Sequence, residues 1–292
     1  MKTLSNKQLT LRIEEAGAEL SSIVANASGK EYLWQADPAF WKRRSPVLFP
    51  IVGAVWEDTY RYKGQAYTLS QHGFARDRMF SPVTDTASEI RFRLTSDEET
   101  LRIYPFPFEL EIGYRLEENR IEVIWSVKNT GTEPMFFQIG AHPAFNYPDF
   151  QADRPERGYF AFDRTEGLSY VLIGEKGCIA PQSYLLELEN GRLPIDIHTF
   201  DKDALIFENG QLRKVTLCDL RRQPYLSLHF TAPVVGLWSP PIKNAPFVCI
   251  EPWYGRCDRM EYAGTFEKKD WMQSLEPGQG FEASYTIEIE GI

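Results

Sequence analysis

Apolar and polar residues alternate with a period of two along most of the chain. The apolar residues of segments 9–13 and 90–94, for example, are separated by single polar residues. This period places successive side chains on opposite faces of an extended strand. Stretches with helical periodicity are nearly absent, so the pattern predicts many strands, each with one buried and one solvent-exposed face.

Two pairs of strands are separated by short segments typical of hairpin turns. The strand expected at 108–116 is followed by one at 121–127, and the strand expected at 60–62 by one at 66–69. The intervening residues are polar or glycine, as tight connections require. Further strands are expected at 135–139, 205–208, 215–218, 226–230, 235–238, 247–250 and 283–289.

Many short strands with no alternation of strands and helices predict packed antiparallel sheets. The fold class expected is therefore all-β, a large sandwich. A length of 292 residues is long for one domain, but a large all-β sandwich can reach this size. Because no repeat and no low-complexity segment divides the chain, we expect a single domain over residues 1–292.

The net charge and the apolar segments of the chain argue against some classes of binding partner. The chain has 41 acidic and 32 basic residues, a net charge of −9, whereas a phosphate-backbone binder needs a basic face. Residues 1–8 lack the pattern of a signal peptide. The longest apolar stretch, 47–56, contains Pro50 and Gly53 and is far shorter than the ~20 residues that span a bilayer. These features predict a cytoplasmic protein with no nucleic-acid or membrane partner.

The four cysteines do not form a metal-binding pattern. Cys178, Cys218, Cys249 and Cys257 include no CxxC pair and no histidine at zinc-finger spacing. Cys218 and Cys249 lie in apolar runs, where buried free thiols are typical of a reducing compartment. We therefore expect no metal site built from these cysteines.

Two ionisable residues adjoin apolar segments. Glu251 closes the run 247–250, and His142 lies within 139–146. A carboxylate at the end of a buried strand loses hydration unless it is paired, which raises its pKa toward the range of a general base. On this ground alone, Glu251 could equally turn to solvent, and His142 could be a hydrogen-bonded core residue.

A second polar cluster spans residues 71–77, where His72 and Arg76 follow an expected strand. A loop with a neutral donor and a guanidinium suits recognition of hydroxyl or phosphate groups; the alternative is a surface ion pair of Arg76. Arg43 and Arg44 could add positive charge to a pocket, although adjacent basic residues are commonly just solvated.

Taken together, five segments resemble the aldose 1-epimerase family, in particular its branch of LacX-like and hexose-6-phosphate mutarotase-like proteins. They follow one another in order over nearly the whole chain, which makes the match specific. The segments are Ser45-Pro46-Val47-Leu48-Phe49-Pro50-Ile51-Val52-Gly53, His72-Gly73-Phe74-Ala75-Arg76, Gly140-Ala141-His142-Pro143-Ala144-Phe145-Asn146, residues 200–207 with Asp203, and Cys249-Ile250-Glu251-Pro252-Trp253.

The resemblance implies a β-supersandwich with an open sugar cleft and no metal or organic cofactor. It also implies that Glu251 removes the anomeric hydroxyl proton and that His142 protonates the ring oxygen, a division of labour that acid–base ring opening requires. Positions matching His72, Arg76 and Asp203 contact the sugar in that family. Many relatives carry a basic residue where this chain has Ala54.

Trp238 and Trp253 lie beside the implied site. Either indole could stack on the apolar face of a pyranose or could belong to the core. The expected partner is a small-molecule aldose or aldose phosphate, bound by a monomer or homodimer.

Three other functions stay open. Arg76 with Arg43 or Arg44 could hold the phosphate of a hexose 6-phosphate, although the net negative charge disfavours it. A carbohydrate-binding or regulatory protein would not need both an acid and a base. A glycosidase would need two carboxylates around one bond, and the sequence does not identify such a partner for Glu251.

Overall fold

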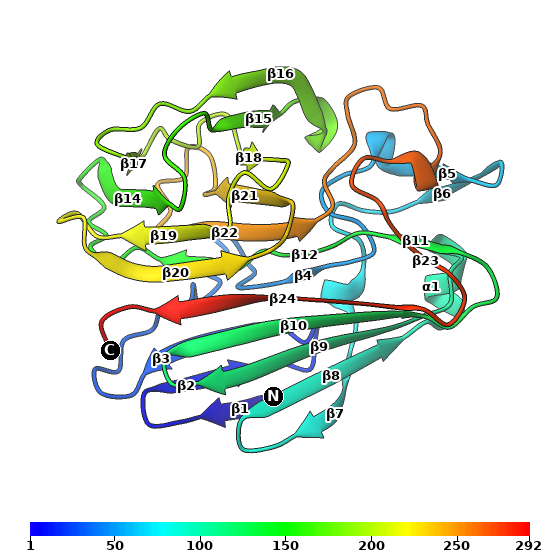
Figure 1. Ribbon diagram of the computed structural model, residues 1–292, viewed down its shortest axis with the longest axis horizontal. Helices are drawn as coiled ribbons and strands as arrows, with labels where there is room; N and C mark the ends of the chain where they lie inside the picture. Colours follow the sequence, from blue (N-terminus) through cyan, green and yellow to red (C-terminus); the bar gives the residue numbers. More distant parts are fainter.

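The computed structural model describes all of residues 1–292. Its largest layer is a nine-stranded antiparallel sheet (Figure 1). From one edge to the other, the strands are β17 (Arg192–Asp196), β14 (Glu156–Phe162), β19 (Lys214–Cys218), β20 (Pro224–Phe230), β24 (Gly280–Ile289), β10 (Arg120–Asn129), β9 (Phe108–Glu117), β8 (Glu89–Thr95) and β7 (Ser81–Asp85).

A second sheet has eight antiparallel strands and carries the candidate site. Figure 1 shows β16, β15, β18 and β21 above β22, with β24 and β10 to β7 below it. The strands in order are β16 (Ile179–Leu185), β15 (Ser169–Ile173), β18 (Leu205–Phe207), β21 (Val234–Trp238), β22 (Phe247–Tyr254), β12 (Ile139–Ala141) and β4 (Val47–Leu48), and β13 (Ala144–Asn146) also pairs with β22.

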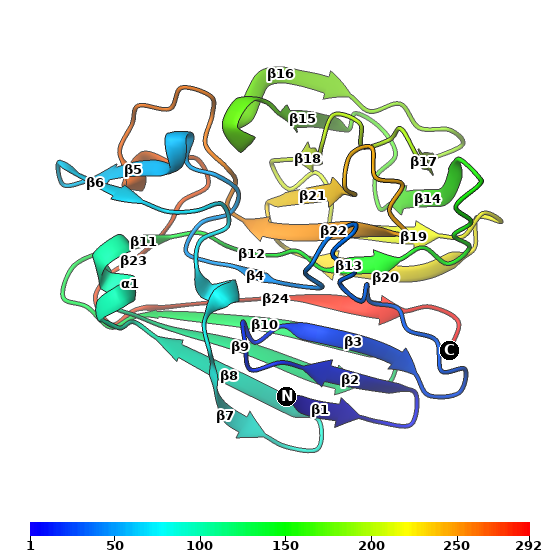
Figure 2. The same ribbon diagram turned by 180° about the vertical axis from the view of Figure 1, so that it is seen from behind.

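Smaller elements cover the two sheets. The strands β1 (Lys2–Ser5), β2 (Leu9–Ile13) and β3 (Leu20–Ala25) form a sheet that lies in front of β8 to β10 in Figure 2. Two-strand pairs are formed by β5 (Thr59–Tyr62) with β6 (Gln65–Thr68) and by β11 (Met135–Phe137) with β23 (Gln273–Leu275). The helical elements are α1 (Glu98–Ile103) and the 3₁₀ turns Trp56–Asp58, Ala75–Asp77, Glu175–Gly177 and Phe266–Lys268. None of these helices has the length and apolar composition that a bilayer crossing requires.

The main core is a cluster of 64 buried residues that draws side chains from both large sheets. In β10 the residues alternate between buried and more exposed positions, as the period of two predicts. Trp125 of β10 is 1% exposed and Ile250 of β22 is fully buried in the same cluster. The predicted all-β class of large packed antiparallel sheets is confirmed.

The predicted hairpins are confirmed, with small differences in length. Phe108 pairs with Asn129 and Glu117 with Arg120, so the turn contains only Glu118 and Asn119. Glu118 adopts a left-handed φ of 49°, which suits a tight hairpin connection.

Two strand predictions were wrong in detail. The segment expected as one strand at 135–139 is divided between β11 and β12, which belong to different sheets. The separating residue, Gln138, donates its backbone N–H to Pro50 and accepts the backbone N–H of Val52 on its side chain. The strand expected to end at 250 continues as β22 to Tyr254, so Glu251 lies inside a strand and not at its end.

Candidate active site

A cavity of about 270 Å³ lies on the face of the eight-stranded sheet that points away from the main core. It is lined by seven of the nine residues predicted to form the site. These are His72, Arg76, His142, Asp203, Trp238, Glu251 and Trp253, together with residues such as Trp41, Gln71 and Ile206. A volume near the lower end of small-molecule sites, about 300–1,000 Å³, suits one compact ligand.

The register of β22 directs Glu251 into this cavity. Ile250 packs in the main core, so the alternation along the strand turns Glu251 and Trp253 to the other face. Glu251 pairs with Gly236 of β21, and Trp253 pairs with Gly140 of β12. A Cβ at Gly236 or Gly140 would lie 2.5 Å from the Trp253 indole. The two glycines therefore make room for Trp253 beside the carboxylate.

His142 and Glu251 lie in direct contact. His142 Nε2 is 3.2 Å from Glu251 Oε2, and the side chains are 9% and 1% exposed. His142 Nδ1 has no hydrogen-bond partner within the protein, and Glu251 Oε2 makes the ion-pair contact with His142 but no hydrogen bond. Buried polar atoms are nearly always satisfied, so atoms without a hydrogen bond on two residues that line one cavity are typical of a ligand-binding site.

Burial shifts the pKa of both groups toward the neutral forms. Desolvation lowers the pKa of His142 to about 3, and the positive charges of Arg76 and Arg43 act in the same direction. Desolvation raises the pKa of Glu251 well above its usual value, helped by the negative charge of Asp203. Both shifts favour the uncharged forms of this contacting pair.

Two indoles surround the imidazole of His142. The Trp41 ring stacks on it with a centroid distance of 4.7 Å and an interplanar angle of 28°, and Trp238 meets it edge-on at 5.3 Å. An indole face attracts a cation, so Trp41 favours the imidazolium form against the effect of burial. Trp41 was not predicted from the sequence, although it stands two positions before Arg43.

His72 is held by the loop that contains Gly53. The Gly53 backbone N–H donates to His72 Nδ1 at 3.1 Å, and the His72 backbone N–H donates to the Gly53 carbonyl at 2.8 Å. Burial lowers the pKa of His72 well below its usual value. Because Nδ1 accepts, the neutral ring carries its proton on Nε2, which leaves His72 with one hydrogen-bond donor on its ring.

Of the three arginines predicted for the site, one lines the cavity and two do not. Arg76 lines the cavity and donates from Nη2 to the Gln71 carbonyl at 2.6 Å. Burial lowers the pKa of Arg76 to about 10. Arg43 does not line the cavity; its guanidinium group lies 2.9 Å from the carboxylate of Asp77. Arg44 does not line the cavity; its backbone N–H donates to Glu19.

Asp203 lines the cavity from a position two residues before β18. It adopts a left-handed φ of 70°, and its side chain accepts the backbone N–H of Ala204 at 2.7 Å. Burial raises the pKa of Asp203. Its carboxylate is a second acceptor in the cavity wall beside Glu251.

The other predicted features lie outside this cavity or at its border. All four cysteines are free and buried, and the buried positions predicted for Cys218 and Cys249 are confirmed. Cys249 offers a thiol whose sulphur lies within 4.8 Å of ligand atoms of His142 and Glu251. Such a donor set could hold a zinc ion, but burial raises the pKa of the Cys249 thiol well above its usual value and so opposes the thiolate that zinc needs.

The chain is similar to proteins of one known family. Residues 1–158 match the family model described as aldose 1-epimerase. The plasmid-encoded protein LacX of Lactococcus lactis subsp. lactis is 33% identical over 295 residues, covering 98% of each chain.

Two solved structures have the same fold over their full length. The galactose mutarotase related enzyme from Lactobacillus acidophilus is 35% identical with a TM-score of 0.93, covering 99% of this chain and 97% of that one. A galactose mutarotase-like protein from Lactobacillus casei is 31% identical with a TM-score of 0.94, covering 99% and 100%. Sequence and structure together show that this chain belongs to the aldose 1-epimerase family.

Proposed function

We propose that this protein is a mutarotase that interconverts the α and β anomers of an aldose. The observation that carries the proposal is the His142–Glu251 contact at 3.2 Å in a cavity of sugar size. The anomeric hydroxyl oxygen O1 and the ring oxygen O5 are bonded to the same carbon. An acid and a base that lie side by side can therefore serve both oxygens of one pyranose.

During ring opening, Glu251 gains one proton and His142 loses one. The Glu251 carboxylate accepts the O1 proton while the His142 imidazolium donates a proton to O5, and the C1–O5 bond breaks to give the open aldehyde. The pair is then neutral on both members. Rotation about C1–C2 and reclosure with the roles reversed give the other anomer and restore the starting charges.

The surroundings act in opposite directions on the two protonation states of the pair, in which Glu251 and His142 are both charged or both neutral. Burial favours the neutral pair, whereas hydroxyl donors of a bound sugar and the stacked face of Trp41 favour the carboxylate and the imidazolium. His72 and Asp203 supply a donor and an acceptor for the remaining hydroxyl groups. Trp253 offers an apolar surface for the pyranose.

A hexose 6-phosphate is a second candidate substrate, because Arg76 lines the cavity with Arg43 close behind it. A guanidinium pair suits a phosphate group. Asp77 already neutralises part of this charge, since it lies 2.9 Å from Arg43 and 3.8 Å from Arg76. We therefore place free aldoses first.

The test is the approach of fresh α-D-glucose and α-D-galactose, and of their 6-phosphates, to anomeric equilibrium, followed by polarimetry or NMR. We expect wild type to accelerate the free sugars. His142→Asn and Glu251→Gln should each lower kcat by about 10²–10⁴, the usual contribution of a general acid or base.

The chain offers a matched control. His229 and Glu288 form another histidine–glutamate contact, 2.8 Å long, on the nine-stranded sheet away from the cavity. His229→Asn and Glu288→Gln should leave kcat unchanged. Absence of acceleration with every sugar would refute the proposal, acceleration of the 6-phosphates alone would establish the phosphate-specific enzyme, and release of alcohol from aryl glycosides would indicate a glycosidase.

A further inference from the structure

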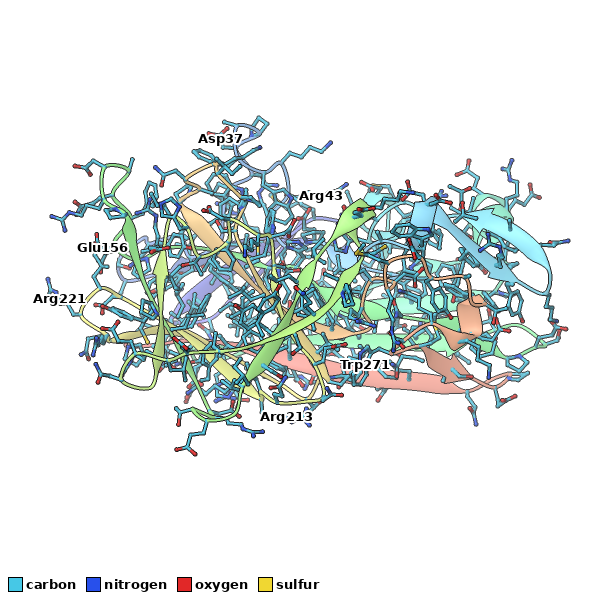
Figure 3. All side chains as sticks on the ribbon, turned by 90° about the horizontal axis from the view of Figure 1, so that it is seen from above. Asp37, Arg43, Glu156, Arg213, Arg221 and Trp271 are labelled. Atoms are coloured by element: carbon cyan, nitrogen blue, oxygen red, sulfur yellow. The ribbon has the colours of Figure 1, made fainter.

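The segment between β22 and β23, residues 255–272, borders the candidate active site and takes no part in the proton transfers proposed above. Of its residues, only Cys257 lines the cavity that contains His142 and Glu251. Figures 1 and 2 show this segment (orange) beside β5, and Figure 3 places Trp271, near its end, close to the middle of the molecule. The segment contains a buried lysine, Lys269.

Asp258 of this segment is 4% exposed, and each of its four polar groups makes a hydrogen bond. Its backbone N–H donates to the carbonyl of Ala54 at 2.9 Å, and its own carbonyl accepts the backbone N–H of Ile179 at 2.8 Å. Its carboxylate accepts the backbone N–H of Trp56 at 2.9 Å and the ammonium of Lys269 at 2.8 Å. Asp258 thereby joins the loop at 54–56 to the start of β16 and to Lys269.

Lys269 and Asp258 form an ion pair that is closed to solvent. Their side chains are 2% and 4% exposed, and Lys269 Nζ also donates to the carbonyl of Arg256 at 2.6 Å. Because charges lose their hydration when they are buried, such a pair often gives no more stability than apolar residues of similar volume. Stability alone therefore does not explain the pair, and a role that depends on its fixed geometry is the alternative.

The loop attached to Asp258 is the one that orients His72. The backbone N–H of Gly53, the residue before Ala54, donates to His72 Nδ1 at 3.1 Å, and the carbonyl of Gly53 accepts the backbone N–H of His72 at 2.8 Å. Gly53 also lies directly against Cys257, since a Cβ at Gly53 would collide with that side chain. Residues 257 and 258 together therefore fix the position of the Gly53 N–H.

A further contact holds the same loop on the other side of Gly53. The backbone N–H of Val52 donates to Gln138 Oε1 at 3.1 Å, and Gln138 Nε2 donates to the carbonyl of Asp270 at 2.8 Å. Asp270 directly follows Lys269 in the sequence. Gly53 is thus flanked by residues whose hydrogen bonds lead back to positions 269 and 270, so the position of Lys269 determines the position of the loop.

The position of Gly53 decides which ring nitrogen of His72 carries the proton. Because burial lowers the pKa of His72 well below its usual value, the ring is neutral and has one N–H. The hydrogen bond from Gly53 requires Nδ1 to accept and leaves the proton on Nε2. At 3.1 Å this bond is near the upper end of the usual range of about 2.7–3.2 Å. A small outward shift of Gly53 would therefore break it and allow the other tautomer.

We propose that Asp258 and Lys269 are positioning residues for sugar binding. The buried pair holds the loop at 52–56, and the loop holds His72 in the tautomer that donates a hydrogen bond from Nε2 to a sugar hydroxyl group. The proposal rests on the sugar-binding role of His72 in the proposed function and adds two residues that do not touch the sugar.

The first variant is the double substitution Asp258→Asn with Lys269→Met, which removes both buried charges and so leaves neither unpaired. We expect KM for α-D-glucose and α-D-galactose in anomer equilibration to rise about three- to tenfold, the effect of one hydrogen bond. The value of kcat should change by less than about twofold, because His72 transfers no proton. Asp258→Asn alone is the second variant, since a buried lysine can lose its proton; it should raise KM as well.

The control is Ile287→Ala in β24, which creates a cavity in the main core, where Ile287 is fully buried. It should lower the stability of the fold and leave KM unchanged. A cycle with His72→Asn tests whether the pair acts through His72, because in that background the double substitution should change KM no further. A similar rise in KM for Ile287→Ala, or a rise of equal size in the His72→Asn background, would overturn the proposal.

NMR of the protein with ¹⁵N-labelled histidine separates this proposal from the proposed function, because it needs no turnover. The chain has four histidines, and His72→Asn identifies the signals of His72. We expect Nδ1 of His72 to be unprotonated in wild type and in Ile287→Ala, and the Nδ1–H tautomer to appear in the double variant. If it appears but no sugar is turned over, the mutarotase function fails and the positioning of His72 stands. A proton on Nδ1 in wild type, or one tautomer shared by wild type and both Asp258 variants, overturns the proposal.

Discussion

His142 and Glu251 lie in positions that lower the stability of the fold. Glu251 is 1% exposed, and its Oε2 contacts His142 without forming a hydrogen bond; His142 is 7% exposed, and its Nδ1 has no hydrogen-bond partner. A buried polar atom without a partner costs about 1–3 kcal/mol, and more when it is charged. Native proteins keep such atoms where function requires them.

Glu251→Gln should therefore raise the free energy of unfolding while it abolishes turnover. The folded pKa of Glu251 lies above its unfolded value, so its contribution to stability is complete below the unfolded pKa and is lost as the pH rises through the folded one. Glutamine does not titrate, so the advantage of the variant should be near zero at about pH 4 and about 1–3 kcal/mol at about pH 8. Urea unfolding at the two pH values measures it.

Glu288→Gln is the matched control, since Glu288 is part of a partly exposed pair with His229. It should show no such gain at the higher pH. A Glu251→Gln variant that is less stable than wild type at about pH 8 would contradict the inference that the buried Glu251 carboxylate lowers the free energy of unfolding at that pH.

For individual residues, the sequence identified most side chains of the candidate site, but it predicted their burial and contacts only in part. Glu251 was expected at a strand end, where turning to solvent was an equal alternative; its register inside β22 removes that alternative. The stacking of Trp41 on His142 joins residues about a hundred positions apart. No local pattern encodes such a contact.

Among the elements, β22 depends on small residues in both of its neighbours. Gly236 of β21 and Gly140 of β12 border Trp253, and a Cβ on either would come within 2.5 Å of the indole. The absence of side chains at these two glycines thus leaves the space that the Trp253 indole occupies beside the cavity.

Gly236→Ala should overpack this site, destabilise the fold by about 1–3 kcal/mol and lower kcat, because Trp253 must move and Glu251 with it. Thermal unfolding and anomer equilibration measure the two effects. Gly113→Ala is the control: it also lies in a strand, but its nearest neighbour is the flexible side chain of Arg91, at 3.1 Å. Equal effects of the two substitutions would refute the specific role of Gly236.

Element prediction was accurate where alternation was regular, as in β9 and β10. It was wrong at 135–139, where the side chain of Gln138 accepts from Val52 and donates to the carbonyl of Asp270. These distant partners divide the segment into β11 and β12. Hydrogen bonds of this kind override local propensity and cannot be read from a short window.

At the scale of the whole molecule, burial controls the reactivity of every thiol. It raises the pKa of Cys178 to about 11 and that of Cys257 to about 12, and it also raises the pKa of Cys218 and Cys249. The thiolate is the reactive form. The folded protein should therefore react only slowly with a disulfide reagent such as DTNB.

Titration of the native and urea-unfolded protein with DTNB checks this expectation. We expect essentially no fast-reacting thiol in the native state and four after unfolding, in agreement with four free cysteines. A native thiol that reacts at the rate of a small-molecule thiol would contradict the buried positions.

The fold class was predictable because alternation extends along the chain, and so was most of the candidate site, because its residues stand in recognisable segments. A larger cavity of about 870 Å³, lined by residues of β15 and β16 and by the segment that carries Arg256 and Trp271, was not, because these segments meet only in the folded protein. Volume and charge balance are properties of that assembly.

The central claim is that His142 and Glu251 act as one unit on the anomeric centre. The most direct test is the anomer exchange rate of glucose and galactose at equilibrium, measured by NMR for wild type, His142→Asn, Glu251→Gln and the double variant. Residues that act together give strongly non-additive losses, so we predict that the double variant is no slower than the slower single one. Losses that multiply, or a wild-type rate equal to that of buffer, would contradict the claim.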